Sequence, residues 1–181
     1  MSTVANDPSS KFKELVVYIA RRLPPEAALG RVKLAKLLMN CDFEAYAYLG
    51  ASITGATYEK WEHGHFPREL VLAEKDLEAA GRISQETISY YNRQLRYTTA
   101  QDDPDMASFT DEEMEIIEGV LSRYGHESAT VLRALAHDEP GWRLAEDKEA
   151  IPYDTVFLSK SGPTLEDVRR GEVLALAHGW E

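Results

Sequence analysis

The sequence has few of the features that mark secreted or membrane proteins. Its 181 residues contain one cysteine, Cys41, so the chain cannot form an internal disulfide. No apolar run approaches the roughly 18 residues that a membrane-spanning helix requires. The first residues, MSTVANDPSS, lack the basic and then apolar pattern of a secretory signal. These absences predict a protein of the reducing cytoplasm with no membrane partner.

Positive charge is also scarce. The chain has 20 Lys and Arg against 31 Asp and Glu, and its formal net charge is −11. Because contacts to phosphate must come from Lys and Arg, we expect no direct binding to nucleic acid. The charge is uneven, since residues 9–36 carry seven basic and two acidic residues. A basic flank on an acidic body could steer a protein partner, or it could simply be a set of solvated helix faces.

Common catalytic motifs are missing as well. The sequence has no Gly-rich phosphate loop, no Gly-x-Ser-x-Gly elbow and no His-Glu-x-x-His pair. One cluster leaves an enzyme open: His63 and His65, with His137 as a third ligand, could hold the metal of a metal-dependent hydrolase. The other interpretation of this stretch is a structured loop in which Gly64 permits a tight turn. With so little catalytic apparatus, a binding module is favoured over an enzyme, and no cofactor is expected.

What the sequence does contain is a dense apolar helix over residues 33–49. Leu37, Leu38, Cys41, Ala45 and Tyr48 follow the spacing of a buried helix face, and Gly50 suits a left-handed helix end. Other apolar residues lie on its remaining sides, so we expect this helix at the centre of the fold.

Asp42 lies inside this apolar helix. If its carboxylate points inward, it must be paired or hydrogen-bonded, by Lys36, by His137 or by backbone amides of the 54–64 loop. It could serve as a general acid or as an organising buried acceptor, and the second role is favoured.

The rest of the chain predicts further helices. One runs over residues 8–23 and ends before Pro24-Pro25, another opens at Pro67, and Thr110 and Glu113 form a capping box. A last helix over 164–178 is interrupted at Gly171, and a hairpin or strand is expected near 94–99. We therefore predict a single compact domain over 1–181, mainly α with a minor β element, with its core at about 30–158 and the first and last helices as flanks.

Two blocks of sequence resemble a known family. The first is KLAKLLMNCDFEAYAYLGASITGATYEKWEHGHFP (33–67), and the second is FTDEEMEIIEGVLSRYGHESATVLRALAHDEPGWRLAEDKEAIPY (109–153). Both are similar to the Panacea domain of SocA-like antitoxins, in the same order. The chain departs from the family pattern at Met39, where the family has Tyr, and at His65, where it has Pro.

The resemblance implies an antitoxin of a bacterial or prophage toxin–antitoxin pair that neutralises its toxin by direct contact. SocA-like members can also act as adaptors that deliver the toxin to the ClpXP protease. The resemblance carries over no catalytic residue, and the oligomeric state is left open. The motif positions are expected mainly to shape the fold: Lys36, Asp42, Thr54, Gly55, Tyr58, Gly64, Pro67, His137, Trp142 and Tyr153. The surface expected to contact the toxin comprises Trp61, His63, His65 and Phe66.

Overall fold

The computed structural model describes residues 8–24, 27, 29–90, 93–158, 160 and 165–178. The described elements form a mainly α fold with two separate two-stranded antiparallel sheets, as the sequence predicts. In chain order they are α1 (Pro8–Arg22), α2 (Arg31–Leu49), β1 (Tyr58–Trp61), β2 (Gly64–Pro67), α3 (Leu70–Ala79), β3 (Ile83–Tyr90), β4 (Arg93–Ala100), η2 (Met106–Ser108), α4 (Asp111–Tyr124), α5 (Ala129–His137), α6 (Pro140–Leu144), η3 (Tyr153–Phe157) and α7 (Leu165–His178).

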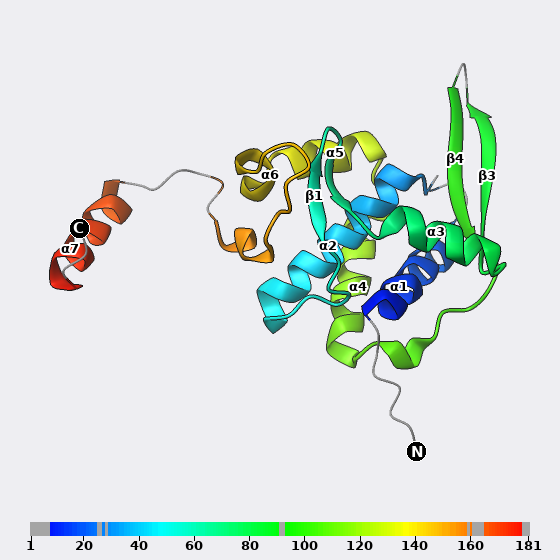
Figure 1. Ribbon diagram of the computed structural model, residues 1–181, viewed down its shortest axis with the longest axis horizontal. Helices are drawn as coiled ribbons and strands as arrows, with labels where there is room; N and C mark the ends of the chain where they lie inside the picture. Colours follow the sequence, from blue (N-terminus) through cyan, green and yellow to red (C-terminus); the bar gives the residue numbers. More distant parts are fainter. Residues whose placement is uncertain are drawn as a thin grey trace.

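Helix α2 lies at the centre, which confirms the prediction for residues 33–49. It contacts α1, α4, α5, β2 and η3, and these elements surround most of its length (Figure 1). Gly50 ends it in the left-handed conformation, with φ of 77°. The expectation for Tyr48 is wrong: its side chain is 77% exposed, because the last turn of α2 extends beyond the elements that cover the rest of the helix.

Local sequence signals set the ends of two other helices. The side chain of Phe12 is buried, and α1 stops at Arg22, just before the Pro24-Pro25 pair. At the start of α4, Thr110 accepts a hydrogen bond from the Glu113 amide while the Glu113 carboxylate accepts one from the Thr110 amide, so the predicted capping box is present.

Residues 58–67 form a short hairpin. Strands β1 and β2 pair antiparallel, with Tyr58 opposite Pro67 and Trp61 opposite Gly64. The expectation that Pro67 opens a helix is therefore wrong. Pro67 is the last residue of β2, where its missing amide proton is tolerated, and α3 begins at Leu70.

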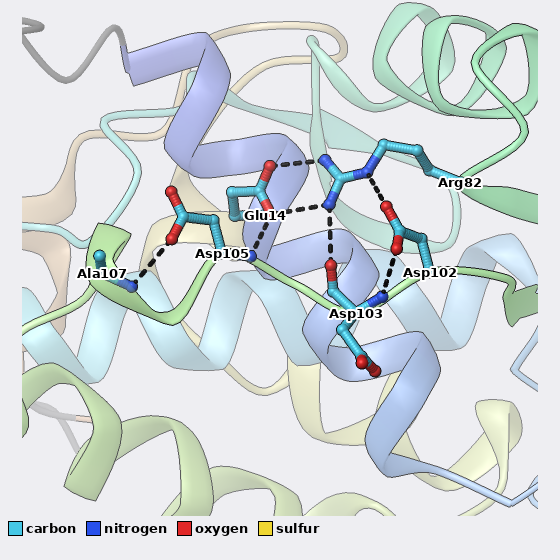
Figure 2. A network of polar contacts seen from close by, with 6 residues as sticks. All are labelled: Glu14, Arg82, Asp102, Asp103, Asp105 and Ala107. Carbon is cyan, nitrogen blue, oxygen red and sulfur yellow. Dashed lines mark hydrogen bonds and ion pairs between the residues drawn. The ribbon is translucent and has the colours of Figure 1, made fainter.

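The predicted β element near 94–99 is a longer hairpin of β3 and β4. It is tied to α1 by a polar network around Arg82 (Figure 2). The Arg82 guanidinium donates to both oxygens of Glu14 at 2.6 and 3.0 Å and also binds Asp102. Glu14 in turn accepts the Asp105 amide at 2.7 Å, so the loop after β4 is fixed to α1 as well.

Helix α7 covers the predicted C-terminal helix apart from residue 164, which lies outside the described residues. It runs unbroken through Gly171, so the expected interruption is wrong; an interior glycine costs a helix only about 1 kcal/mol. Figure 1 shows α7 away from the other helices, and the side chains of Leu165 and Leu176 are exposed. No helix in the described ranges is long and apolar enough to cross a membrane.

Candidate functional site

The buried carboxylate of Asp42 fixes the loop that follows α2. It accepts hydrogen bonds from the Thr54 amide (2.7 Å), the Thr54 hydroxyl (2.5 Å) and the Tyr58 hydroxyl (2.7 Å). Burial raises the pKa of Asp42 to about 6, although these three donors act in the opposite direction. Between the two partners, Gly55 turns the chain with φ of 69°. Asp42 therefore holds the start of β1 against α2.

Of the three predicted partners of Asp42, only a backbone amide of the 54–64 loop is confirmed. Lys36 instead donates from Nζ to the His65 carbonyl at 2.5 Å, on strand β2 near the tip of the hairpin. Its side chain is buried, and burial lowers its pKa to about 7. Lys36 therefore fixes β2 against α2, just as Asp42 fixes the segment that leads into β1.

His137 and Trp142 hold the tip of the same hairpin. His137 Nε2 lies 2.9 Å from the Glu62 carbonyl oxygen, and Trp142 Nε1 donates to the Trp61 carbonyl at 3.0 Å. The two rings stack with centroids 4.1 Å apart. Lys60, which the sequence did not single out, places Nζ 4.6 Å from the centre of the Trp142 ring. Helices α5 and α6 thus bind two successive carbonyls at the hairpin tip.

Tyr153 closes the other side of the hairpin. Its hydroxyl donates to the Ala56 carbonyl at 2.6 Å, and its ring packs on Phe43 and Tyr46. Tyr46 adds a hydrogen bond to Asp154, a contact that the sequence did not reveal because 108 residues separate the two. The motif residues from Lys36 to Tyr153 therefore converge on one structure, the hairpin β1–β2.

The three histidines of the metal hypothesis do not converge. His63 is exposed at the hairpin turn, whereas the side chain of His65 is buried and packs against Phe43. The Nε2 atom of His137 already faces the Glu62 carbonyl. Within the described residues, no group of three or more His, Cys, Asp or Glu could hold a metal ion.

His65 also departs from the expected toxin-contact surface. Its side chain is 1% exposed, because β2 turns it toward α2, and burial together with the nearby Lys36 charge lowers its pKa to about 3. Its Nδ1 atom has no hydrogen-bond partner in the described chain. His65 lines a cavity of about 280 Å³ between α2, α4 and η3, which no sequence signal indicated.

Trp61, His63 and Phe66 remain on the outside, and we call them the hairpin surface. The Trp61 side chain is 43% exposed, and its ring centroid lies 5.2 Å from that of Phe66, which is half-buried. Glu59 accepts a hydrogen bond from Trp61 Nε1 and another from Arg68, so the outer ring is oriented by its own strand. The result is a small aromatic patch on a hairpin that several elements hold in place.

Fold and site together define a helical domain whose buried polar groups hold a surface hairpin. The family model of the SocA-like antitoxin, Panacea domain, matches residues 34–143, more than half of the chain, including most of α2, the hairpin, His137 and Trp142. The chain therefore belongs to the SocA-like Panacea family. No curated protein matches the chain, and no solved structure does.

Proposed function

We propose that the protein is an antitoxin that neutralises its cognate toxin by direct contact through the hairpin surface, not by catalysis. The family match over residues 34–143 carries this proposal. The hairpin supports it, because the motif residues hold this element in place and leave Trp61 exposed. Tryptophan is enriched among the side chains that dominate binding energy at protein interfaces.

The way the hairpin is held suits such a role. Its base is bonded to α2 through Asp42, its strand β2 is bonded to α2 near the tip through Lys36, and its tip is bonded to His137 and Trp142. A segment that is already ordered loses little conformational entropy when a partner binds, so more of the interaction energy appears as affinity. The hairpin surface is thus prepared for a partner before contact.

Co-expression with the reading frame next to the gene tests the proposal. The neighbour should be toxic alone and harmless beside this protein. Trp61→Ala should weaken neutralisation while changing the unfolding free energy by less than about 1 kcal/mol, as for other surface substitutions. A neighbour that is harmless alone, or one that stays lethal in the presence of this protein, would contradict the proposal.

Tyr48→Ala is the matched control, because Tyr48 is an exposed aromatic residue on the same fold. It lies on α2, 12 residues after Lys36, and hence roughly 18 Å farther along the helix axis. This variant should neutralise as well as the wild type. Equal losses in the two variants would show that the hairpin surface is not the site of contact.

The same assay separates simple binding from delivery to a protease. In a host that lacks ClpXP, an antitoxin that acts by occupying the toxin should still protect the cell, and the toxin should accumulate in the complex. We expect this result, because the hairpin surface provides contact without degradation. Loss of protection in that host would instead assign the protein an adaptor role.

A further inference from the structure

A cavity lies directly behind the hairpin surface. It has a volume of about 210 Å³ and separates the first turns of α2 from the hairpin. Its walls are mostly apolar and include Val32, Ala35, Trp61 and Phe66. A space of this size can take one side chain of a partner that docks on the hairpin surface.

Lys36 and Gly64 both line this cavity. Gly64 has φ of 99°, and a Cβ atom at this position would lie 2.7 Å from Lys36 Nζ. The missing side chain of Gly64 is therefore what leaves room for the amine immediately beside the hairpin turn. The mostly apolar cavity thus has a buried amine placed against one of its walls.

The charge of Lys36 has no counter-ion in the described chain. Nζ has one partner, the His65 carbonyl, although an ammonium group offers three protons. Asp42, the buried carboxylate on the same helix, is already bonded to Thr54 and Tyr58. A buried charge is costly unless it is paired, and no acidic side chain of the described chain pairs with Lys36.

The other charged groups at the cavity do not fill this role. Arg31 is paired with Glu74 at 2.6 Å, so its charge is already balanced. Glu62 and His63 line the cavity too, but both are exposed at the turn. Lys36 is thus the buried cation at this cavity that lacks a carboxylate.

We propose that the cavity receives a carboxylate side chain of the toxin, an Asp or Glu, which pairs with Lys36. The argument rests on the proposed function, because it assigns the chemistry of the partner group that enters behind the hairpin surface. The apolar walls exclude water from such a pair, which strengthens the attraction between the two charges. The same pairing would favour the charged form of Lys36, so complex formation would take up protons near neutral pH.

Calorimetry with the purified neighbouring toxin, carrying an inactivating substitution, tests this inference. Titrations at pH 7 in two buffers of different ionisation enthalpy give both the affinity and the number of protons taken up. For the wild type we expect net proton uptake, since burial lowers the pKa of the free amine to about 7 and part of the amine is therefore unprotonated at that pH. Lys36→Met should abolish this uptake and weaken binding by at least about 30-fold, as for other buried charge pairs.

Two further variants keep the test decisive. Lys36→Gln is shorter and retains a donor for the His65 carbonyl, so it serves as the test variant if Lys36→Met folds poorly. It should show the same two losses. Lys33→Met is the matched control, because Lys33 is also buried on α2 and bonded to one backbone carbonyl, that of Ala27, but does not line this cavity. Its affinity and proton uptake should equal those of the wild type.

Replacing each Asp and Glu of the toxin by Asn or Gln should then identify one position whose effect disappears in the Lys36→Met background. Wild-type affinity and proton uptake in both Lys36 variants would overturn this inference alone. Failure of the wild-type protein to bind the toxin would overturn the proposed function and this inference together. The two failures are therefore distinguishable in one set of titrations.

Discussion

Gly64→Ala is expected to be one of the most damaging single-methyl additions in the protein. Gly64 has φ of 99°, outside the range that residues with a side chain adopt easily, and this strain costs about 1–2 kcal/mol. The added Cβ would also lie 2.9 Å from the Cβ of Ala136 and 2.7 Å from Lys36 Nζ. Overpacking of this kind costs about 1–3 kcal/mol, so the total loss should be about 2–5 kcal/mol.

The steric part does not relax easily. Lys36 could move its amine away only by giving up its bond to the His65 carbonyl, and the Cβ of Ala136 is fixed to the backbone of α5. Removing that methyl in a Gly64→Ala, Ala136→Gly double variant should relieve part of the clash. The double variant should therefore lose less than the sum of the two single variants.

Urea unfolding of Gly64→Ala and Gly81→Ala separates strain from clash. Gly81 also has a positive φ, 69°, but a Cβ there meets nothing within 4 Å. Gly81→Ala should lose about 1–2 kcal/mol, the backbone part alone. Gly64→Ala should lose at least about 1 kcal/mol more. Equal losses would refute the claim that the hairpin, Lys36 and α5 are packed against one another at this point.

Further predictions concern the polar groups. Arg82→Met should cost about 1.5–3 kcal/mol in urea unfolding, because it leaves a partly buried carboxylate without its partner. Lys13→Met, which breaks an exposed pair, should cost less than about 1 kcal/mol, and equal costs would contradict the network of Figure 2. The pKa of Asp42 is about 6 in the folded protein against 3.8 ordinarily, so folding favours the protonated carboxyl. The contribution of Asp42 to stability is therefore present below about pH 4 and lost as the pH rises through 6. Asp42→Asn should remove this fall of about 3 kcal/mol from the pH dependence of unfolding, and an unchanged profile would contradict it. Trp142→Phe keeps an aromatic ring but lacks the indole N–H that donates to the Trp61 carbonyl. It should cost about 1 kcal/mol and speed amide exchange at the hairpin tip, and unchanged exchange would contradict this role.

The helices could be predicted where local residues determine them. The apolar pattern after Gly30 and the glycine at position 50 predicted a helix over 33–49, and the structure has α2 at Arg31–Leu49. Thr110 and Glu113 form their capping box within four consecutive residues, so distant packing is not needed to recognise it. Such signals depend on neighbours in sequence, and the sequence displays them directly.

The hairpin β1–β2 could not be predicted in the same way. Each strand has four residues, too few for an alternating pattern, and its pairing depends on contacts with α2, α5 and α6. His65 looked exposed because histidine and its glycine neighbour are common in surface turns, yet packing against Phe43 buries it. The sequence predicted a helix start at Pro67 because proline is common at the first position of a helix. In the structure Pro67 instead ends β2, where it pairs with Tyr58 of β1.

The positions of Lys36 and Asp42 explain why so many motif residues surround one small hairpin. The two are six residues apart on α2, a spacing that places them on different faces, so they cannot pair with each other. Each must bind another segment: Asp42 binds the segment that leads into the base of the hairpin, and Lys36 binds strand β2 near its tip. Asp42→Ala, which removes an inner contact away from the proposed Lys36 pair, should therefore lower stability and toxin neutralisation together, whereas Trp61→Ala should lower neutralisation alone. If Asp42→Ala lowered neutralisation at unchanged stability, Asp42 would act on the toxin directly and this division of roles would be wrong.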